Sequence, residues 1–274
     1  TSKLLRVRLL PNSYEFGYPP EFGYVACLNS GRRRACGGEM RGGRLVGMKR
    51  KRSAFTLLEL LMVLGVMGLL MSVLLPAVGV VREKAQRMAT GQKVRQLALG
   101  VAGFHTVTGR PLTAANLGGW MSRLAEATGI REGGLYIYPE DPLLAAIAEE
   151  APPALIERGE DMNWGPIEGF ANWPVGVAVA SGVAPGASPS TTPVVWTRGL
   201  TGEGTWQGGA GQRAGIYGTE GGYVGFLDGH VEFYRDLGAN GGQLLDYATG
   251  QRTGDIREAL PPGARVYDHA GRVF

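Results

Sequence analysis

Residues 49–81 of this chain read KRKRSAFTLLELLMVLGVMGLLMSVLLPAVGVV, and this stretch decides the fold. Four basic residues at 49–52 precede an apolar run in which Glu59 is the single charged residue. The uncharged segment from Leu60 to Val81 would span roughly 33 Å as a helix, against about 30 Å for the hydrocarbon core of a bilayer. The stretch therefore predicts a long N-terminal helix with its transmembrane part over residues 55–81.

The balance of free energies favours membrane insertion in spite of Glu59. The segment Leu60–Val81 contains seven Leu and six Val, which together favour insertion by roughly 4 to 8 kcal/mol. A carboxylate at the centre of a membrane helix costs on the order of 3 kcal/mol, and Glu59 lies near one end, where the cost is smaller. The basic residues at 49–52 should stay in the cytoplasm, which gives a single span. A charge at the membrane also marks Glu59 as a candidate functional residue.

Residues 53–59, SAFTLLE, resemble the processing site of type IV prepilins and type II secretion pseudopilins. The resemblance implies that a prepilin peptidase cuts between Ala54 and Phe55 and methylates the new N-terminal amine of Phe55. Glu59 then becomes the fifth mature residue, where the family has its glutamate. Pro76 becomes the twenty-second, where many members have a proline that kinks the helix. Ala54 departs from the family, which usually has Gly before the cut, and we expect slower or equal processing.

The role that the resemblance implies for Glu59 has a physical basis. When subunits stack into a filament, the amine of Phe55 in one subunit can pair with Glu59 of its neighbour, so that each charge offsets the desolvation of the other. A wrong stagger would leave a buried charge unmatched, and the pair therefore fixes the axial register. Pro76 lacks an N–H and should bend or open the helix. That bend either lets the helix re-pack when it leaves the bilayer or only reflects the frequency of Gly and Pro in membrane helices.

Residues 1–54 are predicted to be a leader. Within it, residues 1–47 are either an over-extended reading frame or a long leader, because Met48 stands directly before the basic stretch, as an initiator should. Both cysteines, Cys27 and Cys36, fall in this part, so they are weak grounds for a disulfide or a metal site. Without residues 1–54 the chain has 16 basic and 21 acidic residues, a formal charge of −5 in place of +4. We therefore expect no nucleic-acid partner.

Beyond Arg82 the sequence becomes amphipathic. Apolar residues recur at spacings of three, four and three, at Val94, Leu97, Val101 and Phe104. This periodicity predicts one helix over 55–105, with a second half that packs on a head formed by residues 106–274. A helix that ends near His105, followed by the turn at 109–111, also resembles a bacterial pilin-like subgroup. The fold class that we expect is α+β: a long N-terminal helix, membrane anchor first and amphipathic after, packed on a loop-rich antiparallel β-sheet head.

The head sequence predicts several further elements. A second helix is expected over Leu117–Thr128, a helical segment over 143–156 that Pro152-Pro153 interrupts, and strands over 135–138, 175–180 and 193–197. The clearest element is a hairpin of residues 223–227 and 230–234, because Asp228-Gly229 suits a two-residue turn in which both positions have φ > 0. This hairpin resembles a motif of the same subgroup, a His followed after nine residues by Asp-Gly. Gly218 stands where that His would be, so no role of the histidine transfers.

The sequence predicts neither an enzyme nor a resident cofactor. Asp228 lies in the turn and His230 on the following strand, so this pair alone is not expected to build a catalytic triad. The chain has three His and no H-E-x-x-H or paired Cys/His spacing. Calcium is the one candidate ion, with Asp236, Asp246 and Asp255 in Gly-rich loops, although no EF-hand spacing is present.

These observations predict a structural subunit of a type IV pilus-like or type II secretion pseudopilus filament. The expected partners are prepilin peptidase, other pilin or pseudopilin subunits and the bacterial inner membrane. The N-terminus would be cytoplasmic and the head periplasmic until the subunit enters the filament. The alternative is a membrane-anchored periplasmic binding protein or enzyme that uses the helix only as a tether. Ordinary secretion, with cleavage near Ala77–Gly79, remains a further alternative.

Overall fold

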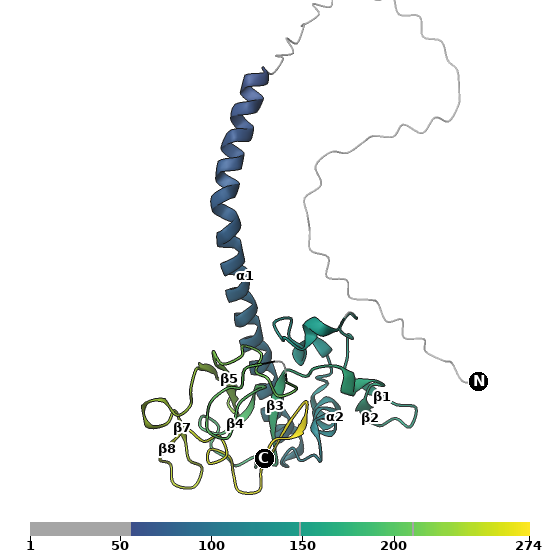
Figure 1. The fold of residues 1–274 in the computed structure, drawn as a ribbon. Coiled ribbons are helices and arrows are strands. Elements are labelled where there is room, and N and C mark those ends of the chain that lie inside the picture. Colours follow the sequence, from purple (N-terminus) through teal and green to yellow (C-terminus); the bar gives the residue numbers. More distant parts are fainter. Residues whose placement is uncertain (1–55, 148, 210) are drawn as a thin grey trace, which may run out of the picture. The chain divides into compact units, whose positions relative to one another are not determined.

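A computed structural model describes residues 56–147, 149–209 and 211–274 of the protein (Figure 1). The first element is the helix α1, Leu57–Thr108. Thr56 begins it, because its backbone is extended and its Oγ1 accepts the N–H of Glu59 at 3.2 Å. The helix ends at Gly109, which adopts the left-handed conformation (φ 64°) and donates its N–H to the carbonyl of His105 at 2.8 Å.

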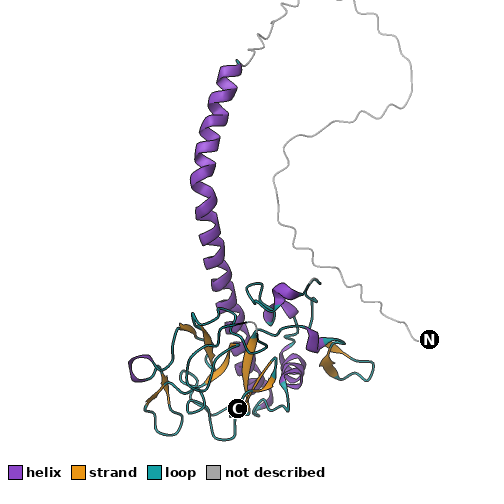
Figure 2. Cartoon of the chain, viewed as in Figure 1, coloured by secondary structure: helices purple, strands orange, loops and turns teal. Residues whose placement is uncertain are grey.

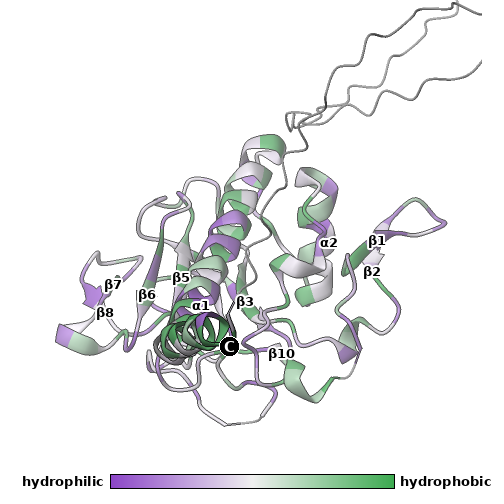
Figure 3. Cartoon of the chain, turned by 90° about the horizontal axis from the view of Figure 1, so that it is seen from above, coloured by the Kyte–Doolittle hydropathy of each residue, from purple (hydrophilic) through white to green (hydrophobic). Residues whose placement is uncertain are grey.

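The two halves of α1 lie in different surroundings. In the second half Val94, Leu97, Val101 and Phe104 are all buried, so the predicted apolar stripe is confirmed. In the first half the large apolar side chains are exposed, and Figure 3 colours the start of α1 as strongly apolar. The amphipathic pattern of the second half therefore marks where the helix joins the head.

The backbone of α1 stays helical across Pro76. Figure 2 shows α1 as one continuous, gradually curved helix, and the bend expected at Pro76 stays a prediction. In the part of the chain that the structure describes, no helix qualifies by length and apolarity as a membrane span. The transmembrane role of residues 55–81 stays a prediction.

The second helix, α2, runs over Leu117–Thr128 and has the predicted limits. Asn116 caps its start, where Oδ1 accepts the N–H of Gly119 at 2.7 Å, and the left-handed Gly129 ends it. Its buried face includes Trp120, whose indole N–H donates to the carbonyl of Ala180 at 3.2 Å. Through this face α2 packs between α1 and the strands of the head.

The head is built on a six-stranded antiparallel sheet with the order β10-β9-β3-β4-β5-β6. Its strands are β3 (Val177–Ser181), β4 (Pro193–Thr197), β5 (Gly222–Phe226), β6 (Val231–Tyr234), β9 (Arg265–Asp268) and β10 (Gly271–Arg272). The second half of α1 lies across β4, β5 and β6. The strands β3 and β4 are buried along their whole length and form the centre of the core. The α+β class with an antiparallel sheet is thus confirmed.

Short elements complete the described part of the head. Two small hairpins pair β1 with β2 and β7 with β8. Their bounds are β1 Ile156–Arg158, β2 Trp164–Pro166, β7 Leu244–Leu245 and β8 Arg252–Thr253. Four 3₁₀ turns lie at η1 Gly133–Leu135, η2 Leu144–Ala146, η3 Phe170–Asn172 and η4 Ala239–Gly241.

Two predicted elements were wrong. Residues 135–138 form no strand: η1 includes Leu135, and the N–H of Ile137 bonds the carbonyl of Gly133. Tyr136 and Tyr138 alternate in sequence because both are buried in the core, which mimics the period of a strand. The helix predicted over 143–156 is reduced to η2, and β1 begins at Ile156. Pro152 and Pro153 interrupt it, and the carbonyl of Pro153 instead accepts the N–H of Gly133.

The hairpin of β5 and β6 is confirmed, but its turn differs from the predicted one. Pairing of Gly225 with Val231 and the bond from the Phe226 N–H to the His230 carbonyl leave three loop residues, 227–229. Of these only Gly229 has a positive φ, 86°. Asp228 keeps a negative φ because its Oδ1 accepts the N–H of His230 at 2.9 Å, which closes the turn from within. The arrangement is that of a three-residue hairpin with a left-handed glycine.

A buried ion pair ties three loops of the head together. Arg198 follows β4, and its Nη2 lies 2.7 Å from Oδ1 of Asp141, with both side chains 0% exposed. The guanidinium also donates to the carbonyls of Ala214 (2.9 Å) and Val175 (3.0 Å). Asp141 Oδ1 in turn accepts the N–H of Leu143 at 3.0 Å. Loss of either partner would leave a buried charge without compensation.

We expect the substitution Asp141→Ala to lower the free energy of unfolding by about 3 to 5 kcal/mol, because Arg198 would stay buried without its counter-charge. Urea unfolding of the purified protein, followed by tryptophan fluorescence, measures the change. Glu157→Ala, at an exposed position of β1, is the control and should shift stability by less than about 0.5 kcal/mol. A similar small loss in both variants would contradict a structural role for the pair.

Candidate processing and assembly site

The predicted processing residues, Ala54 and Phe55, lie outside the described residues, and the site is described from Thr56 onward. Glu59 lies in the first turn of α1. A negative charge there interacts favourably with the helix dipole, by about 0.3 to 1 kcal/mol. The side chain is exposed, and its carboxylate has no ion pair or hydrogen bond to any described residue. The carboxylate of Glu59 can therefore pair with a group that lies outside the described residues.

The surface around and beyond Glu59 is apolar on every side. The large apolar side chains that the structure describes between Leu57 and Val81 are 44 to 77% exposed. Soluble monomers seldom expose contiguous apolar patches above a few hundred Å², and larger ones mark contacts with protein or membrane. A helix that is apolar all round is normally buried. This half of α1 therefore requires a cover that the described chain does not supply.

Arg87 fixes α1 to the head at the point where the exposed half ends. Its Nη2 lies 2.6 Å from Oε2 of Glu220 and 2.9 Å from Oε1 of Glu83. The hydrogen bond with Glu220 raises the pKa of Arg87 above its ordinary value. The guanidinium carbon also lies 5.0 Å from the centre of the Tyr217 ring, a cation–π distance. Sequence reasoning missed this contact, because Glu220 is 133 positions away along the chain.

One turn further along, the helix rests on a group of aromatic rings. Lys93 Nζ lies 5.2 Å from the Tyr138 ring centre, and burial lowers the pKa of Lys93. Tyr217, Tyr223 and Phe233 pack edge to face at 5.0 to 6.2 Å. Edge-to-face pairs of this kind add about 0.5 to 1.5 kcal/mol beyond their area burial. Rings and cations together hold α1 against the head.

The side chains of Asp228 and His230 contact each other in the turn of the hairpin. The carboxylate oxygen Oδ1 lies 2.6 Å from Nδ1 of His230, whose ring stacks on Phe226 at 4.1 Å. Burial of Asp228 opposes its ionisation, but hydrogen bonds from His230 outweigh this and lower the pKa of Asp228. No hydroxyl or thiol of a described residue bonds to the pair. The contact closes the hairpin turn and forms no triad.

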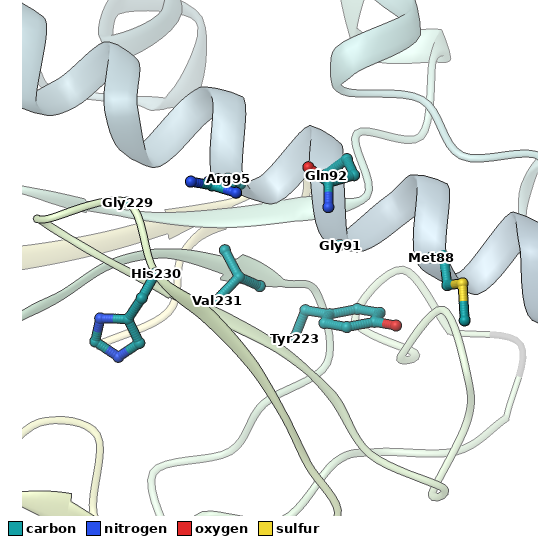
Figure 4. Close-up of a pocket in the computed structure, with 8 residues that line it drawn as sticks. All are labelled: Met88, Gly91, Gln92, Arg95, Tyr223, Gly229, His230 and Val231. Atoms are coloured by element: carbon teal, nitrogen blue, oxygen red, sulfur yellow. The ribbon is translucent and has the colours of Figure 1, made fainter.

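A cavity of about 440 Å³ lies between α1 and the hairpin (Figure 4). It is lined by Met88, Gly91, Gln92, Arg95, Tyr223, Gly229, His230 and Val231. The His230 ring points away from α1 in Figure 4, so this residue contributes mainly its backbone. The side chains of Gln92 and Arg95 come from α1 and border the opening.

The three candidate calcium ligands each bond within a separate loop. Asp236 Oδ1 accepts the N–H of Gly238, and Asp246 Oδ1 accepts those of Ala248 and Thr249. Asp255 instead forms an ion pair with Arg257. Among the residues that the structure describes, no group of three or more His, Cys, Asp or Glu side chains is placed to hold a metal ion. Calcium binding in these loops stays a prediction.

Residues 49–75 match the family model described as the prokaryotic N-terminal methylation motif. The matched segment contains Ala54, Phe55 and Glu59 and confirms the resemblance to type IV pilin-like and pseudopilin precursors. It indicates prepilin-type processing, a membrane-anchored precursor and assembly with pilin subunits, and it favours a structural subunit over an enzyme. No curated protein and no solved structure matches the chain.

We expect Glu220→Gln to loosen the junction between α1 and the head, because Arg87 loses its closest charged partner. Partly exposed pairs contribute about 0.2 to 1 kcal/mol, so amides over residues 84–91 should exchange up to about fivefold faster. Hydrogen exchange with mass spectrometry measures the change. Glu126→Gln, on the exposed side of α2, is the control. Unchanged exchange over 84–91 would show that the rings alone hold the helix.

Proposed function

We propose that this protein is a structural subunit of a type IV pilus-like or type II secretion pseudopilus filament. The methylation motif at residues 49–75 is the observation that carries the proposal. The exposed apolar half of α1, which continues directly from that motif, supports it. A chain whose first helix must be covered by lipid or by other copies is suited to a membrane precursor that later polymerises.

In the proposed pathway prepilin peptidase cuts between Ala54 and Phe55 and methylates the amine of Phe55. The basic residues at 49–52 keep this end in the cytoplasm, and Leu60–Val81 holds the precursor in the bacterial inner membrane. The head, with its sheet and α2, then lies in the periplasm. The formal charge of −5 on the processed chain suits a solvated head and does not suit a nucleic-acid partner.

Assembly is proposed to depend on Glu59. The carboxylate is exposed, lacks a described partner and stands in the first turn of α1, four residues after Phe55. In a stack of helices it would face the amine of a neighbouring subunit in apolar surroundings. Removal of one member of a buried pair costs about 3 to 5 kcal/mol, enough to select one axial stagger over the others.

Pro76 is proposed to make α1 deformable. A proline supplies no N–H, so the carbonyl of Ser72 lacks the usual donor four residues on. The hydroxyl of Ser72 does not replace this bond, because its Oγ donates to the carbonyl of Leu69 at 2.7 Å. The helix stays continuous in the isolated chain, and a weakened turn would allow it to stretch when it packs among other helices.

We expect Glu59→Ala to leave membrane insertion unchanged and to reduce filament incorporation at least tenfold, because a lost buried pair corresponds to more than 1.4 kcal/mol. Membrane fractionation and immunoblotting of sheared filaments measure the two quantities. Glu59→Asp keeps the charge and should retain part of the incorporation, and Glu150→Ala is the surface control. Wild-type incorporation of Glu59→Ala would refute the proposed pairing.

We also expect mass spectrometry of the native polypeptide to find N-methylated Phe55 as its first residue. Deletion of the prepilin peptidase should leave the basic residues at 49–52 attached. A first residue near Val80 would instead show ordinary secretion. An intact leader in the presence of the peptidase would favour a tethered periplasmic protein.

A further inference from the structure

The strand β6 forms an open edge of the main sheet. The strand order ends at β6, and its one described partner is β5. The register pairs Glu232 with Val224 and Tyr234 with Gly222, and the Phe226–His230 bond sets which residues face β5. By the alternation of an antiparallel ladder, the N–H and C=O groups of Val231 and Phe233 point to the other side. This edge is a template for a further strand.

A row of side chains on α1 lies next to this edge. Met88, Gln92, Arg95 and Leu99 follow one another at spacings of four, three and four and therefore share one face of the helix. The first three line the 440 Å³ cavity together with Tyr223 and Val231 (Figure 4). The edge strand and the helix thus form the two walls of one groove.

Glycines set the depth of the groove. A Cβ at Gly91 would lie 3.1 Å from the Tyr223 ring, and one at Gly229 would lie 2.3 Å from Leu99 Cδ2. Because these two positions have no side chain, α1 approaches the hairpin closely and leaves little space directly beneath the helix. The remaining space is the cavity that α1 shares with Tyr223 and Val231, and it is open to solvent.

The charge of the groove comes from Arg95. This guanidinium is exposed and forms no ion pair or hydrogen bond with any described residue. Charged side chains elsewhere on α1 and the hairpin have partners: Arg87 pairs with Glu83 and Glu220, and Asp228 with His230. Glu232 lies on the opposite face of β6, where it accepts the hydroxyl of Tyr234 at 2.8 Å. The groove therefore favours an acidic group.

We propose that this groove binds an extended acidic segment of a partner polypeptide, which adds to β6 as a seventh strand and places a carboxylate against Arg95. Backbone bonds to Val231 and Phe233 supply affinity, and the alternate side chains that face α1 supply specificity. Gln92 can bond the same carboxylate or the adjacent backbone. This docking role does not depend on whether the protein polymerises.

The test uses the purified full-length protein and a pool of seven-residue peptides. Each has Glu at its centre, flanked by randomised Val, Thr, Ile and Tyr, and matched pools carry Lys or Gln there. We expect the Glu pool to be captured at least fivefold better than the Lys pool. Arg95→Gln should abolish the preference, and Arg110→Gln, at an exposed arginine beyond the end of α1, should preserve it. Equal capture of the pools, or an equal effect of both variants, would overturn the charge assignment.

Strand addition has its own test. Val231→Pro removes an outward N–H at an edge position, where proline is tolerated, and should weaken capture at least fivefold with an unchanged circular dichroism spectrum. Captured peptides should also slow hydrogen exchange at Val231 and Phe233 and should lose binding when their own amides are N-methylated. Capture that is indifferent to N-methylation, or that leaves exchange at β6 unchanged, would refute the proposal. No capture of any pool at 1 mM peptide, on the order of the weakest specific binding, would refute it as well.

Discussion

The close packing of α1 on β5 at Gly225 is the contact on which the rest of the structure depends. A Cβ at this glycine would lie 2.9 Å from Val94 Cγ1 and 3.3 Å from Ala98 Cβ, so the strand can touch the helix only because the side chain is absent. That contact sets the distance between α1 and the hairpin. It also brings Tyr223 and Phe233 under the helix and places Arg87 within reach of Glu220.

The two halves of α1 are suited to different environments. Its second half is amphipathic and covers the sheet, whereas its first half is apolar all round and finds no cover in the described chain. A head could fold without the first half, because none of the core residues comes from it. The exposed half is thus attached to the head but does not contribute to its core. This arrangement is expected of a segment that makes its contacts outside the subunit.

Local signals in the sequence predicted the elements whose causes are local. The stripe of Val94 and Leu97, the limits of α2 and the turn glycine of the hairpin each depend on residues close together in the sequence. Two of the misses have distant causes. Tyr136 and Tyr138 imitate a strand because the core buries them, and Arg198 finds Asp141 across 57 positions. At the candidate site Glu59 stood out as a lone charge, but the partner of Arg87 could not be predicted.

The buried pair of Arg198 and Asp141 favours one conformation of the loops of the head over the alternatives. Long Gly-rich loops have many alternative conformations, and apolar contacts alone would stabilise several of them. A buried guanidinium discriminates among them, because only one arrangement supplies the carboxylate of Asp141 and the carbonyls of Ala214 and Val175 together. The pair acts together with backbone bonds from the N–H of Gly176 to the carbonyl of Tyr136 and from the N–H of Arg198 to the carbonyl of Gly176. With these contacts, the central strands stay in the register that holds β5, and through β5 the helix.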